Sequence, residues 1–242
     1  KNRKQMMLEL TTRFTGITTS PKARNGGLTP TAAAAKAKAN LRYITRPSAL
    51  EPDNAMILSR GDFRTPDGER VRTHHQLKAA MRCAIDERSV KGGQRGIRVA
   101  EKMIFSLPND FPPEAQRKAL QRIMRRLGAG SKEPKIIGTI HHDKAHNLHG
   151  HILALDGFET EDQARARRPN AKRVRRQEVI RLGDRGRPKE LRAIFAEVIN
   201  EVALEHGLAG VEHRSFKERG LVHPTKHEGP TRRAKGDEWR QV

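Results

Sequence analysis

The chain has 242 residues and a mass of 27.3 kDa, which is enough for one large domain with a buried core. Lys and Arg number 49 against 28 Asp and Glu, and the formal net charge of +21 indicates a polyanionic partner, with nucleic acid as the first candidate. No apolar run approaches the roughly 20 residues of a membrane-spanning helix, and the single cysteine, Cys83, excludes a disulfide framework and a four-thiolate zinc site.

The predicted elements form a mixed order of strands and helices. In chain order we expect a strand over about residues 6–14, helices over 31–44 and 75–87, a strand over 97–107, a helix over 112–127, strands over 135–142 and 149–156, a helix over 188–206, and a short strand from residue 211. Thr29 is a candidate N-cap of the first helix, with Pro30 at its first position. Residues 48–70 lack a regular pattern, so we expect them to be irregular.

This order predicts an α+β fold in which an antiparallel central sheet carries helices on its faces. We expect one domain over residues 1–216. Residues 157–187 are polar and strongly basic, which predicts a mobile insertion within that domain. Residues 217–242 are basic and contain Pro and Gly, and we expect them to form a loosely ordered tail.

A run of histidines lies between two of the predicted strands. His149 and His151 are two residues apart on one strand, so their imidazoles share a face of the sheet. A short hairpin loop would bring the neighbouring strand alongside, with His141 or His142 at its end. Three neutral imidazoles there would suit a transition metal and leave positions open for a substrate oxygen, as in a catalytic site. The same pattern also fits a solvated loop in a His-rich chain.

Tyr43 is the single tyrosine and lies near the end of the first predicted helix. A phenol is a poor nucleophile at neutral pH, so attack on a phosphate would need a base or a metal bound to that phosphate. The neighbouring Leu41 and Ile44 allow a second interpretation, in which Tyr43 is a packed core aromatic. Taken alone, the residue types favour the packed interpretation.

Several segments together resemble the HUH relaxases of the MobA/MobL mobilization family. The run from His142 to His151 reads H-x4-N-L-H-x-H and is similar to the family's H-x4-N-P-H-x-H, with Leu148 in place of the usual proline. The segment 103–108, a strand ending in Leu-Pro, and the stretches 211–220 and 227–230 also resemble family segments. The resemblance therefore spans all but the ends of the chain.

The resemblance implies an enzyme that nicks one DNA strand at the origin of transfer of a plasmid or mobile element. Such enzymes stay joined to the 5′-phosphate through a tyrosine and religate the strand later. Carried onto this chain, the metal ligands are His142, His149 and His151, and the expected cofactor is a divalent ion (Mg, Mn or Zn). The segment L-R-Y-I-T-R around Tyr43 resembles the L-x-Y-I-x-R motif of the related mobilization group P, which makes Tyr43 the expected nucleophile.

Two departures from the family pattern concern the tyrosine and its base. Many MobA/MobL members carry the tyrosine directly after the Ala-rich run, where this chain has Lys36. Members also often carry a Glu on the strand before Leu-Pro, and that position is Lys102 here, with Glu101 next to it. We therefore take Glu101 as the candidate general base, while Asp143 and Glu87 stay open.

The positive charge offers candidate DNA contacts near the tyrosine, near residue 91 and in the basic insertion. The residues that we expect to contact single-stranded DNA are Arg42, Arg46, Lys91, Arg95, Arg98 and Arg173. Each of them also fits an ordinary solvated surface. Aromatic residues make up only 4% of the chain, so phosphate contacts rather than extensive base stacking should supply the affinity.

Other functions are compatible with the sequence. A rolling-circle replication initiator or a single-strand transposase would share the metal triad, but it would carry its tyrosine after the H-x-H motif, whereas Tyr43 precedes it. A non-catalytic basic nucleic-acid-binding protein is the third candidate. The resemblance also implies a coupling protein and a secretion channel as partners. The single cysteine and the absence of a signal-peptide pattern favour the bacterial cytoplasm.

Overall fold

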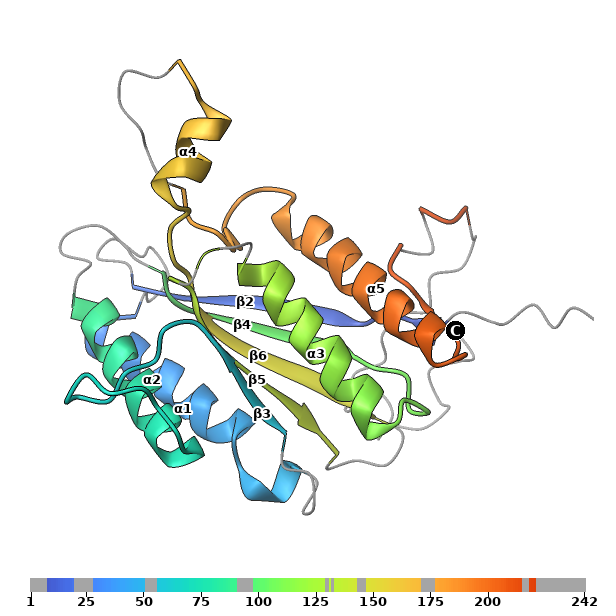
Figure 1. The fold of residues 1–242 in the computed structure, drawn as a ribbon, viewed down its shortest axis with the longest axis horizontal. Helices are drawn as coiled ribbons and strands as arrows, with labels where there is room; N and C mark the ends of the chain where they lie inside the picture. Colours follow the sequence, from blue (N-terminus) through green and yellow to red (C-terminus); the bar gives the residue numbers. More distant parts are fainter. Residues whose placement is uncertain are drawn as a thin grey trace, which may run out of the picture. The chain divides into compact units, whose positions relative to one another are not determined.

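A five-stranded antiparallel sheet forms the centre of this computed structural model (Figure 1). Across the sheet the strands are β2 (Thr12–Thr18), β4 (Arg98–Ser106), β6 (His149–Leu155), β5 (Lys135–His141) and β3 (Ile57–Arg60). Each neighbouring pair runs antiparallel. Two further short strands, β1 (Leu8–Glu9) and β7 (Val211–Glu212), pair in parallel. The expected α+β class with an antiparallel sheet is confirmed.

The structure describes residues 8–19, 28–50, 56–90, 98–128, 131, 133–142, 147–170, 177–214 and 218–220. The chain divides into a unit Lys1–Glu212, which holds all helices and strands of the described residues, and a unit His213–Val242. In the second unit only 213–214 and 218–220 are described. The boundary expected after residue 216 and the loose order expected for 217–242 stay predictions.

Two pairs of helices cover the two faces of the sheet (Figure 1). One face carries α1 (Pro30–Ile44) and α2 (His74–Val90), and the other carries α3 (Pro113–Gly128) and α5 (Arg187–Glu205). Two short pieces complete the set, the turn η1 (Pro47–Ala49) and the helix α4 (Glu161–Arg167). None of the helices in the described ranges has the length and hydropathy that crossing a bilayer requires.

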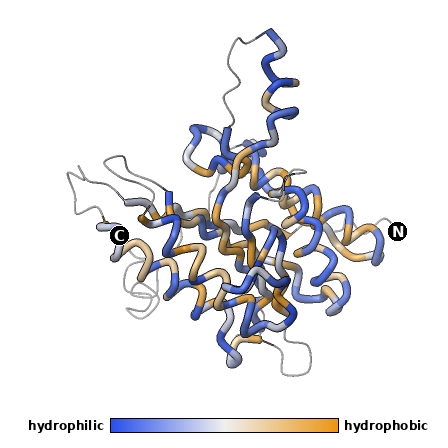
Figure 2. Tube along the Cα trace, turned by 60° about the vertical axis from the view of Figure 1, so that its left-hand side comes forward, coloured by the Kyte–Doolittle hydropathy of each residue, from blue (hydrophilic) through white to orange (hydrophobic). Residues whose placement is uncertain are grey.

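Strand alternation divides the sheet between two hydrophobic cores. In β6, Ile152 and Ala154 pack in the core with α3 and α5, whereas Leu153 and Leu155 pack in the core with α1 and α2. Figure 2 shows the hydrophobic residues gathered where the helices meet the sheet, and α4 coloured mainly as hydrophilic. Every odd-numbered residue of β6 therefore lies on the α1 face.

The first helix forms as the sequence predicts. The Thr29 side chain accepts a hydrogen bond from the Ala32 N–H (3.2 Å), and Pro30 occupies the first turn. The buried face carries mostly alanines in the first turns and larger side chains at the end: Ala33, Ala34, Ala37, Leu41 and Ile44. Small side chains let this helix lie close to the sheet, and its last turn reaches the end of β5.

The structure differs from the predicted elements at three places. The strand expected over 6–14 is two strands, β1 and β2, and the region 48–70 contains η1 and β3. The strand β3 has four residues, lies at the sheet edge and is half-buried, so it lacks an alternating pattern. The insertion 157–187 contains α4, whose start carries a capping box of Thr160 and Gln163.

Candidate functional site

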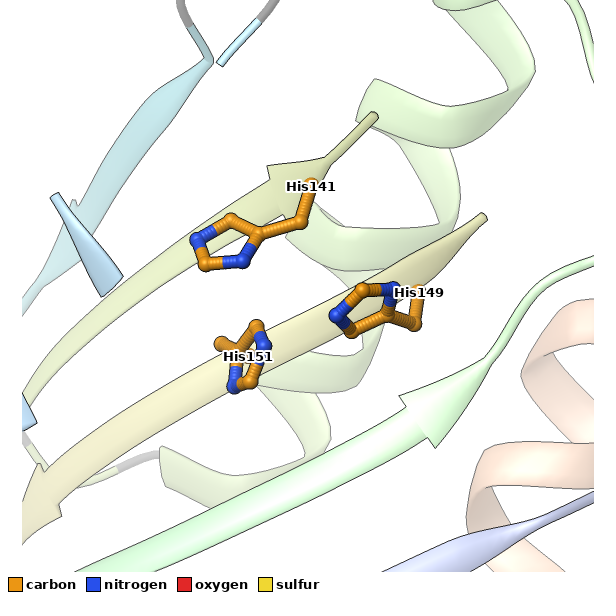
Figure 3. Close-up of side chains that lie close together, drawn as sticks. All are labelled: His141, His149 and His151. Carbon is orange, nitrogen blue, oxygen red and sulfur yellow. The ribbon is translucent and has the colours of Figure 1, made fainter. Parts of the chain in front are cut away.

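Three histidines converge at one end of the sheet (Figure 3). His141, the last residue of β5, pairs directly with His149, the first residue of β6, and His151 lies two positions further along β6. Residues two apart on a strand share a face, so all three imidazoles lie on the α1 side of the sheet. The ring nitrogens that could ligate a metal all lie within 4.8 Å of one another.

The third histidine of this cluster is His141, which corrects the assignment of His142. His142 follows the end of β5, and its backbone N–H donates to the carbonyl of Ala49 at 2.9 Å. Neighbouring residues of an extended chain point to opposite sides, so His142 does not share the face of His141. The two candidates differ by one residue, and only the strand register separates them.

Backbone carbonyls hold two of the rings. His141 Nε2 donates to the carbonyl of Ile44 (2.9 Å), and His149 Nδ1 donates to the carbonyl of Asn147 (2.6 Å). Because a carbonyl only accepts, the donating nitrogen carries the proton, and in each neutral ring the other nitrogen carries the lone pair. Outer contacts of this kind orient metal-binding histidines. Ile44 ends α1, so the first of these bonds also satisfies a helix-end carbonyl and ties α1 to the site.

His151 is 2% exposed, and both of its ring nitrogens are buried without a hydrogen-bond partner among the residues that the structure describes. Burial, followed by the positive charges of His141, His149, Lys102 and Arg46, lowers the pKa of His151 from 6.5 to about 2. The ring is therefore neutral at physiological pH and offers a lone pair. A buried polar group without a partner costs about 1–3 kcal/mol, which a bound metal ion would offset. The donor set fits a metal centre.

Gly150 separates the two histidines of β6 and faces the opposite side of the sheet. A Cβ atom at this position would lie 2.1 Å from the ring of Phe105. That ring packs against Phe195 of α5, with centroids 5.2 Å apart and the planes nearly perpendicular. The glycine between the histidines is therefore required by core packing, whether or not a metal is bound.

Tyr43 lies in the last turn of α1, beside the histidines. Its ring centroid is 5.7 Å from that of His141 and 5.6 Å from that of His151, and 45% of the residue is exposed. The interpretation of Tyr43 as a packed core aromatic is therefore wrong. Tyr43, His149 and His151 line a pocket of about 370 Å³. The other residues that line it are Thr11, Arg13, Ile104, Ser106 and Asn147.

Positive charge surrounds Tyr43. The Arg46 guanidinium carbon lies 3.9 Å from the ring centre, and the same side chain donates to the Tyr43 carbonyl at 2.8 Å. Lys102 Nζ lies 5.3 Å from the ring centre, and burial followed by the charge of Arg13 lowers the pKa of Lys102. Cations over an aromatic face are attracted to it, and the same positive charges attract an anionic group that enters the pocket.

A family model described as the MobA/MobL family matches residues 87–237. The chain belongs to the MobA/MobL family. The resemblance to MobA/MobL-type relaxases is thus confirmed. The match includes the three histidines and leaves Tyr43 outside it.

Solved structures similar in fold to this MobA/MobL protein include one that matches most of the chain. It is described as "Molecular Basis of Vancomycin Resistance Transfer in Staphylococcus aureus", and the superposition has a TM-score of 0.51. The two chains are 15% identical, and the match covers 86% of this chain and 99% of the other. No curated protein matches the sequence. At this identity the structural likeness concerns the fold.

Glu101 does not lie beside the tyrosine, so its assignment as the general base is corrected. It is fully buried on the α3 and α5 face, where its carboxylate accepts from Arg98 (3.1 Å) and from the Leu182 N–H (3.2 Å). Burial, followed by the charge of Asp156, raises its pKa from 4.5 to about 7. Alternation along β4 places Lys102, not Glu101, on the face of Tyr43.

A β-bulge explains why the Arg98 side chain pairs with Glu101. Thr18 pairs with Arg98 and Ile17 with Ala100, so Val99 is an extra residue that turns the Arg98 side chain to the Glu101 face. Arg98 is therefore the structural partner of a buried carboxylate, which corrects its assignment as a DNA contact.

The remaining candidates fall into two groups. Arg42 is exposed on the last turn of α1, close in sequence to Tyr43, and Glu87 lies on α2 in a different pocket from Tyr43. Four candidates lie outside the described residues: Lys91, Arg95, Asp143 and Arg173.

No sequence pattern singles out Arg13, and Lys102 stands out in the sequence only as a departure from the family pattern. The strand register places both residues near the histidines. Arg13 pairs with Ile104, Ile104 pairs with His151, and Lys102 lies two residues before Ile104 on the same face of β4.

Proposed function

We propose that this MobA/MobL protein cuts one DNA strand at the origin of transfer of a plasmid or mobile element and rejoins it later, during conjugative mobilization. The observation that carries the proposal is the position of an exposed tyrosine against a cluster of three histidines. The Tyr43 ring lies 5.6 Å from His151 and 5.7 Å from His141, centroid to centroid. A nucleophile and a centre that can bind a phosphate oxygen therefore border the same pocket.

In the proposed reaction the Tyr43 oxygen attacks the scissile phosphorus. A bond forms between that oxygen and phosphorus, and the bond from phosphorus to the 3′ oxygen breaks. The 3′ oxygen leaves with a proton as a hydroxyl, and the 5′-phosphate stays on Tyr43. The phosphotyrosyl bond retains the energy of the cut bond, so the same 3′-hydroxyl can reverse the step.

His141, His149 and His151 would hold the divalent ion. When bound, such an ion supplies Lewis-acid stabilisation of the charge that develops on the phosphate. Three imidazole nitrogens suit Zn, Mn, Co or Ni better than Mg, which prefers oxygen ligands. The carbonyls of Ile44 and Asn147 keep two of the rings in the required tautomer.

Arg46, Lys102 and Arg13 would stabilise negative charge in the pocket and hold the strand. Among the described residues that line the pocket there is no Asp or Glu, and Asp143, which stays open as the general base, lies outside the described residues. Arg46 and Lys102, which lie over the ring, would stabilise the negative charge that develops on the phosphate during the attack. The same charges, with Arg42, bind the phosphates of single-stranded DNA. A coupling protein and a secretion channel would act on the covalent complex.

The experiment is to trap the covalent complex and map it. Supercoiled DNA carrying the region around the protein's own gene is incubated with the protein and Mn²⁺ or Zn²⁺, and the adduct is digested for mass spectrometry. We expect strand-specific nicking that depends on the divalent ion and a nucleotide on Tyr43.

Tyr43→Phe is the matched control. We expect it to abolish the adduct and to leave DNA affinity within about twofold, since phosphates supply most of the binding. An undiminished adduct in this variant would overturn the proposal. Binding without any divalent-dependent nicking would instead indicate a non-catalytic nucleic-acid-binding protein.

A further inference from the structure

A second pocket lies at the end of the sheet opposite the three histidines. Its volume is about 1100 Å³, and it is lined by β3, the segment after β3, parts of α2 and α3, the start of β5 and the end of β6. Lys135 in this pocket and His141 in the histidine cluster stand at the two ends of β5, about 20 Å apart at roughly 3.3 Å per residue. The pocket is therefore separate from the one that Tyr43 lines.

Basic side chains outnumber acidic ones in the lining, six to three. The basic residues are Arg60, Arg64, Arg70, Arg88, Arg125 and Lys135, and the acidic residues are Asp62, Glu133 and Asp156. The acidic groups already have partners. Asp156 accepts three backbone N–H groups from residues 179–181, Asp62 pairs with Arg64 at 2.8 Å, and Glu133 accepts from the backbone of Phe158. The excess of positive charge around a hollow attracts an anion.

The guanidinium of Arg60 is the strongest indication of a ligand. Its Nε is buried, and no described residue supplies a hydrogen-bond partner for it. Gly128, the last residue of α3, leaves room for this group, because a Cβ there would lie 2.0 Å from that Nε. Arg60 as a residue is only half-buried, so the other nitrogens of its guanidinium can donate into the pocket, and phosphate oxygens are the acceptors that fit the planar fork of an arginine.

Arg125 adds a second cation from the neighbouring turn of α3. It is exposed, it lines the pocket, and within the described part of the chain it makes no ion pair. Two arginines from different elements, β3 and α3, can therefore approach the same phosphate group. Arg88, in contrast, is occupied by the carbonyls of Arg98 and Asp156 and by Glu178.

Apolar side chains provide about a third of the lining. Two aromatic residues line the pocket. Phe158, which follows the end of β6, is 45% exposed, whereas Phe63 is buried. Exposed aromatic rings stack with nucleobases, which are flat and apolar on both faces. Guanidinium groups beside an exposed ring match the phosphate and the base of a nucleotide.

The basic insertion begins at this pocket. Gly157 and Phe158 line it, and α4 follows directly and projects from the body of the protein (Figure 1). The arginines Arg165, Arg167 and Arg168 are exposed on or next to this helix. Arg165 and Arg167 pair with Glu161 and Glu159, so the positive charge that continues from the pocket toward α4 comes from Arg168.

We propose that this second pocket binds a nucleotide, with Arg60 and Arg125 on its phosphate and Phe158 against its base. The nucleotide is either a free mononucleotide or one nucleotide of a DNA strand outside the segment that is cut. Binding of a nucleotide within a DNA strand rests on the proposed function, whereas binding of a free nucleotide does not.

The test measures binding to the full chain by calorimetry and fluorescence anisotropy. The probes are inorganic phosphate, dAMP, and labelled oligothymidylates of about six and about twenty nucleotides, the longer of which can span both pockets at roughly 3.4 Å per stacked nucleotide. The variants are Arg60→Gln, Arg125→Gln and Phe158→Ala. Arg117→Gln is the control, because Arg117 is exposed on the same helix and does not line the pocket.

If the ligand is a free nucleotide, dAMP binds with one site per chain, and each arginine variant weakens it about tenfold, as expected on losing a charge-assisted hydrogen bond. If the ligand is part of a strand, the longer oligonucleotide gains affinity over the shorter one, and the same variants remove that gain. Phe158→Ala should weaken dAMP binding and leave inorganic phosphate unaffected.

The proposal is overturned if Arg60→Gln and Arg125→Gln behave as Arg117→Gln does with every probe. Arg125 is exposed, so its variant should fold even if Arg60→Gln does not, and thermal unfolding of each variant checks this. The binding measurements do not require the protein to cut DNA. They therefore test the second pocket even if the strand-cutting proposal fails.

Discussion

The ring of Tyr43 meets the ring of His151 nearly at right angles, at 5.6 Å between centroids, although one residue lies in the last turn of a helix and the other in a central strand. The hydrogen bond from His141 to the carbonyl of Ile44 holds the helix end in this place. This bond is one of the contacts that tie the end of α1 to the sheet at the site. Substitutions at that contact should therefore change the rate of DNA cutting more than they change the stability of the fold.

The identity of the third histidine is directly testable. We expect His141→Ala to weaken Zn²⁺ or Mn²⁺ binding at least about a hundredfold, because it removes one of three nitrogen ligands. His142→Ala should leave the affinity within about twofold, since this residue points away from the cluster. Metal content by mass spectrometry and competition with a chelating dye measure both. Equal losses in the two variants would contradict the assignment.

Arg46 should act on the reaction more than on DNA binding. Its guanidinium lies over the Tyr43 ring and bonds the Tyr43 carbonyl, so Arg46→Gln removes both a charge near the phenol and a restraint on the helix end. We expect the single-turnover cutting rate to fall about tenfold or more. Arg42→Gln, one helix position before Tyr43, should lower DNA affinity by a few-fold and leave the rate at saturating DNA unchanged. A larger rate loss in Arg42→Gln would argue against this distinction.

Gly150 should resist substitution for a packing reason. Gly150→Ala places a methyl group against the Phe105 ring, and overpacking of this kind typically costs about 1–3 kcal/mol. The matched control is Gly16→Ala, where the added carbon would lie at an ordinary 3.5 Å from the Arg98 side chain. Chemical denaturation followed by circular dichroism compares the two. A stability of Gly150→Ala equal to that of Gly16→Ala would show that the core relaxes around Phe105.

The buried Glu101 should make stability depend on pH. Its pKa is raised from 4.5 to about 7 in the folded protein, so the folded state holds this proton more tightly than the unfolded state does. The resulting stabilisation is complete below about pH 4.5 and is lost as the pH rises through about 7. At 1.36 kcal/mol per pKa unit, the loss is at most about 3 kcal/mol.

Glu101→Gln isolates that effect. We expect the free energy of unfolding of the variant to exceed that of the unaltered protein at pH 8 and to differ less at pH 5. The titration of His151 acts in the opposite direction but is common to both proteins, so it cancels in the difference. Urea denaturation at closely spaced pH values measures this difference. A difference that is constant across the range would contradict the raised pKa.

Much of the site is local enough to be predicted. The H-x-H spacing puts His149 and His151 on one face because the strand period is two, and the caps at Thr29 and Pro30 define the start of the helix that carries Tyr43. Periodicity also predicts the long helices α3 and α5 and the strands β5 and β6. The net charge of +21 points to a polyanion before any motif is considered.

Only the structure could decide between neighbouring residues as members of the site. His141 and not His142 joins the cluster, and Lys102 and not Glu101 faces Tyr43, because a shift of one residue moves a strand side chain to the opposite face of the sheet. Such choices depend on register and on the bulge at Val99, which are set by pairing with distant segments.

The sequence by itself determined the long helices and most of the strands, the basic character and the residue types of the site, since these follow from local periodicity and composition. Only the tertiary structure decided which histidine completes the cluster, that Tyr43 is exposed beside it, and that a second basic pocket lies at the far end of β5. Each of these arises where segments far apart in the chain meet, and no local pattern records where they meet.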